Sequence, residues 1–165
     1  MAPGKALAKF KAAYERNAQK LALPEIKKTV GQATVDVFGH EQAVALANDL
    51  NYTPRPVCQG YVSATAPLIK ANADFYRSAR APQFVIFKLQ TIEAHIPTGD
   101  DSGALLVLTQ DYQPVLAENG YLLLQRKPNA PAATELTPIS SGEIALGDSI
   151  PIPEGTIWCR LHFRE

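Results

Sequence analysis

The chain has 165 residues, which is enough for one domain with a hydrophobic core of its own. Hydrophobic residues make up 46% and charged residues 19%, a composition that excludes an intrinsically disordered chain. The 16 basic and 16 acidic residues cancel, which argues against a nucleic-acid binder that relies on surplus positive charge. The sequence predicts neither a secretory signal nor an apolar run of the roughly 20 residues that span a bilayer.

The first expected element is an N-terminal helix, which occupies the segment 1–22. Apolar residues recur along it at spacings of three and four: Leu7, Phe10, Tyr14, Ala18 and Leu21. This spacing is typical of an amphipathic helix, and the basic residues between the apolar positions indicate a solvated helix face. Pro24 limits any continuation of the helix.

Strands and helices then alternate through the segment 23–127. The strands are expected at 33–38, 57–62 and 83–89, and the helices at 41–50, 67–78 and 103–111. Tyr112 to Leu116 and Tyr121 to Arg126 flank an Asn-Gly pair, which is a strong signal for a β-hairpin. This order predicts an α/β fold with a three-layer sheet, mostly parallel at its centre, with an antiparallel hairpin at one edge.

The composition changes after Lys127. Pro, Ala and Thr dominate the segment 128–141, which we expect to be a linker. The segment 142–165 is expected to be a C-terminal β segment, because residues 156–163 alternate as a half-buried strand does. That strand needs a partner, which is either the main sheet or chain beyond Glu165, in which case the segment is truncated.

Metal and cofactor sites are not indicated by any motif. Cys58 and Cys159 form no Cys-x-x-Cys pair, and each lies in an apolar run. Gly39 alone cannot form a glycine-rich phosphate loop. An acidic cluster with one histidine lies further along: Glu93, His95, Asp100 and Asp101. It lacks the spacing of a calcium loop, and helix capping explains it more simply. We expect no cofactor and no metal.

Asp36 and His40 lie at the end of the first expected strand. In an open α/β sheet, ligands gather outside the carboxyl ends of strands, where an acid and an imidazole could bind a ligand or move a proton. The alternative interpretation, which we favour, is that both residues cap the helix that follows.

A second group of candidate ligand-binding residues is Arg55, Gln59 and Tyr61. The prolines on either side of Arg55 fix its backbone, and a strand over 57–62 would place Gln59 and Tyr61 on one face. Arg, Gln and Tyr side chains recognise carboxylates, phosphates and sugars. The alternative, again favoured, is a buried structural arginine that holds the crossover loop. No residue is singled out as catalytic.

An ordered series of short motifs resembles the soluble segment of a group of uncharacterised bacterial polytopic membrane proteins with a glycosyltransferase-like architecture. The series runs as Val35-Asp36-Val37, Pro54-Arg55-Pro56-Val57-Cys58-Gln59-Gly60-Tyr61, Asn72-Ala73, Ala81-Pro82-Gln83-Phe84-Val85, Ile92-Glu93, Asp100-Asp101, Asp111-Tyr112 and Leu122-Leu123-Leu124-Gln125-Arg126-Lys127. It covers about residues 23 to 127. Cys58, Gly60 and Glu93 depart from the pattern, which has an aromatic residue, a small hydroxyl residue and Asp at these places.

The resemblance implies a domain that belongs to a larger protein, at the extracytoplasmic face of a bacterial membrane and soluble when isolated. It supplies no catalytic residues. Our first hypothesis is therefore a non-catalytic accessory or ligand-recognition domain, whose partners are the remainder of that protein and a small polar or sugar-like ligand, with no nucleic acid. The alternative is a small stand-alone enzyme for a phosphorylated or glycosylated molecule, which requires Asp36, His40 and Arg55 to converge.

Overall fold

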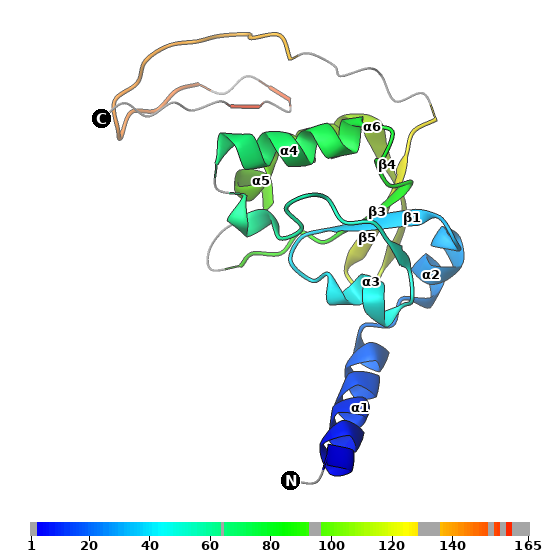
Figure 1. Ribbon diagram of the computed structural model, residues 1–165. Coiled ribbons are helices and arrows are strands. Elements are labelled where there is room, and N and C mark those ends of the chain that lie inside the picture. The colour runs from blue at the N-terminus through cyan, green and yellow to red at the C-terminus, as the bar shows by residue number, and fades with distance from the viewer. Residues whose placement is uncertain are drawn as a thin grey trace. The chain divides into compact units, whose positions relative to one another are not determined.

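The computed structural model describes residues 3–63, 65–92, 97–128, 136–151, 154–155 and 158–159 (Figure 1). The chain divides into two compact units, residues 1–134 and residues 135–165. The helices of the described residues are α1 Pro3–Lys20, α2 Pro24–Val30, α3 Ala43–Ala47, α4 Ala66–Arg77, α5 Pro97–Asp100 and α6 Ser102–Asp111, with a 3-10 helix η1 at Gly60–Val62. The strands are β1 Thr34–Phe38, β2 Asn51–Tyr52, β3 Phe84–Phe87, β4 Tyr112–Glu118 and β5 Tyr121–Arg126.

The five strands form one mixed sheet in the order β2-β1-β3-β5-β4. β1 pairs in parallel with both β2 and β3, while β5 pairs antiparallel with β3 and β4. The predicted α/β class, with a parallel centre and an antiparallel hairpin edge, is confirmed. The three-layer arrangement predicted for the chain stays a prediction.

The strands of the sheet bury side chains on both faces. Val35 and Val37 of β1 join a hydrophobic cluster with residues of α2 and α3, whereas Phe38 joins a second cluster with residues of α4 and α6. Because successive side chains of a strand point to opposite faces, Asp36 lies on the same face of β1 as Phe38. Figure 1 shows α4 and α6 on one side of the strands and α2 and α3 on the other.

The β4–β5 hairpin turns at Asn119 and Gly120, as the Asn-Gly pair predicts. Both residues have positive φ, 49° and 81°, as a tight turn between antiparallel strands requires. The β4 strand is irregular between Pro114 and Leu116, where the register with β5 shifts by a bulge at Val115. Pro114 has no N–H to donate, which suits the edge position of β4.

The strand predicted at 57–62 is wrong. Asn51–Tyr52 supplies the second parallel strand instead, and η1 occupies the end of the predicted range. The reason is visible at Val57, whose backbone N–H donates to Asn72 Oδ1 (2.9 Å) and whose carbonyl accepts from Asn72 Nδ2 (3.0 Å). The amide of one α4 side chain thus takes the place of a neighbouring strand.

The helices begin and end close to their expected positions, but their buried faces differ in detail. α4 buries Asn72, Ala73, Phe75 and Tyr76, whereas Leu68 is exposed. α2 is an additional short helix with Pro24 in its first turn, a position that proline tolerates because that N–H has no helical partner. α1 matches the expected helix, and its apolar stripe is largely exposed.

The second unit contains no helix or strand within its described residues, 136–151, 154–155 and 158–159. The strand expected at 156–163 lies mostly outside the described residues and stays a prediction. Of the helices that the structure describes, none combines the length and apolar character needed to cross a bilayer.

Candidate functional site

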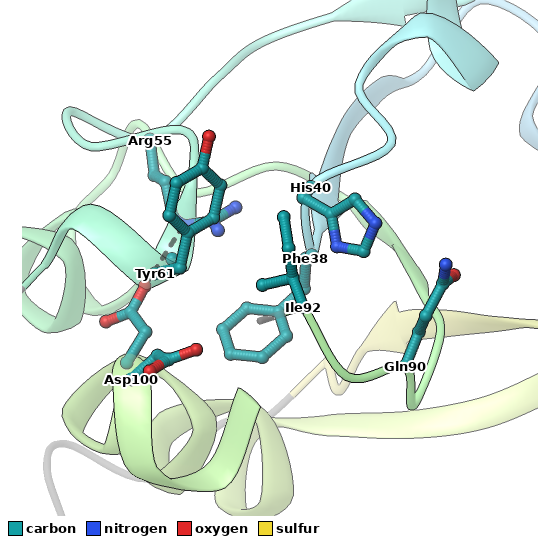
Figure 2. A pocket seen from close by; sticks show the side chains of 10 residues that line it. Phe38, His40, Arg55, Tyr61, Gln90, Ile92 and Asp100 are labelled. Atoms are coloured by element: carbon teal, nitrogen blue, oxygen red, sulfur yellow. Dashed lines mark hydrogen bonds and ion pairs between the residues drawn. The ribbon is translucent and has the colours of Figure 1, made fainter. Parts of the chain in front are cut away.

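A hollow lies at the carboxyl ends of β1 and β3, the two central parallel strands. From β1 the chain continues through α3 to β2, whereas from β3 it continues to α5 and α6 on the opposite side of the sheet. The connections that follow these two neighbouring strands therefore run in opposite directions, which defines a topological switch point. The empty space within the hollow is about 280 Å³ when the space open to solvent is counted. It is lined by Phe38, Gly39, His40, Arg55, Gly60, Tyr61, Gln90, Ile92, Asp100 and Asp101 (Figure 2).

Arg55 forms the inner wall of the hollow and is only 2% exposed. Its Nη1 donates to the Val37 carbonyl (2.7 Å) and to Asp36 Oδ2 (3.2 Å), and its Nε donates to Asp101 Oδ2 (3.2 Å). The guanidinium carbon lies 5.0 Å from the centre of the Phe38 ring. Figure 2 shows the guanidinium reaching past Tyr61 toward the middle of the hollow.

Asp36 is fully buried, and both of its carboxylate oxygens accept hydrogen bonds from other residues of the protein. Oδ2 accepts from the Tyr76 hydroxyl (2.6 Å) as well as from Arg55, and Oδ1 accepts from the Val37 N–H (2.8 Å). Burial raises the pKa of the Asp36 carboxyl, and the Arg55 charge and these hydrogen bonds offset only part of that effect. Burial likewise raises the pKa of Tyr76, so its hydroxyl stays a donor.

Asp101 closes the network at the start of α6. Oδ2 accepts from Asn72 Nδ2 (2.7 Å) in addition to Arg55. Burial raises the pKa of the Asp101 carboxyl, while Arg55, Asn72 and, more weakly, the Ala104 N–H favour its ionised form. Gly103 permits this approach of α6 to α4, because a Cβ there would lie 2.8 Å from Ile69 Cγ2.

Three buried polar atoms beside the hollow have no hydrogen-bond partner. Among the residues that the structure describes, four buried side-chain atoms lack one, and three of them belong to residues that line the hollow: Arg55 Nη2, Gln90 Oε1 and Asp101 Oδ1. A buried polar group without a partner costs about 1–3 kcal/mol, so three of them beside one hollow call for an explanation. One is a donor and two are acceptors.

The sequence-based candidates come together in part. Arg55 and Asp36 form a buried ion pair, and His40 and Tyr61 line the same hollow. Gln59 supports Tyr61 by accepting its hydroxyl hydrogen bond (2.9 Å), although the two residues meet through the turn of η1 rather than along a strand. Within the described part of the chain, no hydrogen bond or ion pair joins His40 to Arg55 or Asp36.

The structure bears on the two alternatives favoured above, a structural role for Arg55 and helix capping by Asp36. Arg55 does hold the crossover loop, through the Val37 carbonyl and Asp101. Asp36 does not cap α3, since its carboxylate points to the α4 and α6 face. In the acidic cluster, Asp101 occupies the position before α6 but binds Arg55, while Glu93 and His95 lie outside the described residues. No group of three potential metal ligands occurs among the described residues.

Glu41, Lys88 and Tyr121 line an adjoining part of the hollow. The charges of Glu41 and Lys88 are paired with each other. Glu41 Oε2 accepts from Lys88 Nζ (2.9 Å) and from the Tyr121 hydroxyl (2.6 Å). Burial raises the pKa of Glu41, but these hydrogen bonds outweigh it and hold the pKa below its usual value. Lys88 therefore offers no unpaired cation to an anionic ligand.

Several residues of the site escaped the sequence reasoning. Tyr76 is expected only as part of a helix, Asn72 only as part of that helix and of the motif series, and no sequence pattern indicates Gln90. The one signal that could have indicated Asn72 is its place on the buried side of α4, one helical turn before Tyr76, because a buried amide needs polar partners.

No family model, no curated protein and no solved structure matches this chain.

Proposed function

We propose that the α/β unit is a non-catalytic ligand-recognition domain that binds a small, neutral, hydroxyl-rich molecule of the sugar type in the hollow at the carboxyl ends of β1 and β3. The observation that carries this proposal is the set of unpartnered buried atoms there, Arg55 Nη2, Gln90 Oε1 and Asp101 Oδ1. A bound molecule with its own donors and acceptors would give each of these atoms the partner that it lacks.

The mixture of donor and acceptors favours hydroxyl groups over a phosphate. A hydroxyl both donates and accepts, so it can donate to Gln90 or Asp101 and accept from Arg55, whereas the dianionic phosphate group of a monoester only accepts. The charges also favour a neutral ligand over an anion, because the Arg55 cation is already paired with the carboxyl groups of Asp36 and Asp101. Ile92 supplies an aliphatic side chain for the C–H groups of a sugar.

The enzyme alternative has less support. An acid–base catalyst must touch its substrate, but Asp36 is 0% exposed and both of its oxygens accept hydrogen bonds from the protein. His40 lines the hollow, yet neither Asp36 nor Arg55 bonds to it within the described residues. Binding without reaction is the simpler use of these groups.

The place of the domain in a larger protein is also a proposal. The motif series between residues 23 and 127 supports a domain of a bacterial membrane protein with a glycosyltransferase-like architecture, held at the extracytoplasmic face. Recognition of a sugar fits such a protein, in which the partners of this domain are the remainder of the chain and the ligand.

The test is a titration of the full, ¹⁵N-labelled chain with glucose, with N-acetylglucosamine and, separately, with inorganic phosphate. We expect either sugar to shift the backbone amide signals of Gly39 and Gly60, which line the hollow, and phosphate to leave them in place. Gln90→Leu removes one acceptor and should weaken binding about fivefold, the worth of about 1 kcal/mol.

Gln83→Leu is the matched control, because Gln83 is exposed at the opposite end of β3. It should leave sugar binding unchanged. Shifts with phosphate but not with the sugars would replace the neutral ligand by an anionic one. The proposal would be contradicted if none of the three ligands shifted these signals, or if the two leucine variants weakened sugar binding equally.

A further inference from the structure

The α1 helix carries an apolar stripe that the rest of the described chain does not cover. Leu7, Phe10 and Tyr14 are 61%, 69% and 52% exposed, although they lie on one face of the helix at spacings of three and four. Only the C-terminal end of the stripe is partly covered, where Leu21 packs against the core under α2 and α3. Exposed apolar residues that line up on one face indicate a contact surface.

The opposite face of α1 is basic. Lys5, Lys9, Arg16 and Lys20 share it, at spacings of four and seven residues. With Lys11, the helix holds five basic residues against the single acid Glu15, a net charge of +4. Since the whole chain is neutral, the remainder carries –4. Positive charge is thus concentrated on the element that exposes its apolar stripe.

We propose that α1 is an interfacial helix, which lies along an anionic lipid bilayer with Leu7, Phe10 and Tyr14 inserted at the headgroup level. A large apolar face opposite a Lys/Arg-rich face is the arrangement that binds such surfaces, because burial of the stripe and attraction to anionic headgroups act together. The long lysine side chains can bend around the helix from its basic face toward the headgroups.

The charges favour a bilayer over a second copy of the chain. Two α1 helices paired through their stripes would bring together two helices that each carry a net charge of +4. An anionic surface instead attracts the positively charged helix. This inference stands independently of the ligand proposed for that hollow.

The test is sedimentation of the full chain with phosphatidylcholine vesicles that either contain or lack phosphatidylglycerol. We expect binding at least about tenfold stronger with the anionic lipid, and release of the protein by added salt. Leu7→Ser/Phe10→Ser should abolish binding to both kinds of vesicle. Lys5→Gln/Lys9→Gln should weaken binding to the anionic vesicles alone.

Leu46→Ser is the matched control, because Leu46 of α3 is 58% exposed and lies outside the stripe. It should bind vesicles as the unmodified chain does. Because all the substituted side chains are exposed, thermal unfolding of each variant should match that of the unmodified chain. Absence of vesicle binding, unchanged binding by Leu7→Ser/Phe10→Ser, or a dimer that dissociates in that variant would overturn the proposal.

Discussion

The two faces of the sheet are built from the same strands but differ in what β1 places on them. On the α2 and α3 face, β1 contributes Val35 and Val37, which pack among other hydrophobic side chains. On the α4 and α6 face, it contributes Phe38 and the carboxylate of Asp36. On the first face β1 therefore contributes only hydrophobic burial, while on the second it also holds a charge that is tolerated only because it is paired.

The hollow therefore lies beside the face whose burial contributes less to stability, because that face includes charged groups. A buried ion pair is seldom more stable than hydrophobic residues of the same volume, so stability alone gives no reason for Asp36 and Arg55. Their network holds the guanidinium beside the hollow with one nitrogen unpartnered. Three substitutions test the contrast between the faces.

The largest effect is expected from Arg55→Met. Removal of the guanidinium leaves Asp36 and Asp101 buried without a cation, so the free energy of unfolding should fall by about 4 kcal/mol at neutral pH. Urea unfolding measures this loss, which should shrink in acid as the two carboxyl groups become protonated. Arg77→Met, at an exposed position on α4, is the control, and an equal loss in both variants would contradict the ion-pair account.

Ile86→Ala tests the hydrophobic face. Ile86 of β3 is fully buried in the cluster under α2 and α3, so its truncation should lower the free energy of unfolding by about 3 kcal/mol. In contrast to Arg55→Met, the loss should be the same at acidic and neutral pH, because no titratable group loses a partner. A loss that varied with pH would remove the distinction between the two faces.

The smallest effect is expected from Asp101→Asn, measured as the pH dependence of unfolding. The pKa of Asp101 is raised in the folded chain above the ordinary value of 3.8. The protonated carboxyl therefore favours folding, and this contribution is complete below pH 3.8 and is lost as the pH rises through the folded pKa. Asparagine keeps one acceptor oxygen for Arg55 and Asn72.

The variant should lack this decline, so its stability relative to the unmodified chain should rise with pH across that window. The comparison must be made as a difference between the two proteins, because other groups titrate there too. Glu41, whose pKa is lowered, contributes stability that is lost as the pH falls. A difference that did not vary with pH would show that Asp101 titrates alike in the folded and unfolded chains.

Local signals predicted much of the sheet. The β-branched run of β1, the apolar run of β3 and the Asn-Gly turn of the hairpin each depend on neighbouring residues, and all three elements form where expected. The segment 57–62 failed because its backbone is bound by Asn72, fifteen residues from Val57. Local strand propensity does not reflect a hydrogen-bond partner so far along the chain.

The site shows the same limit. The two prolines that fix the backbone of Arg55 and the place of Asp36 near a strand end indicate both residues as candidates, and the structure joins them in an ion pair. The pairing of Arg55 with Asp101 depends on the contact between α4 and α6 at Gly103, which no local pattern reveals. The stripe of α1 was predicted from its spacing alone, whereas its exposure depends on what the rest of the chain fails to cover.

Both edge strands of the sheet, β2 and β4, offer few regularly spaced backbone N–H and C=O groups for a further strand. β2 has only two residues and is followed by Pro54 and Pro56, while β4 carries Pro114 next to its bulge. An added strand requires a regular row of unpaired N–H and C=O groups, and neither edge offers one over more than a few residues. The sheet is thereby protected against aggregation through its edges, and a crowded solution of this protein should not extend it into fibrils.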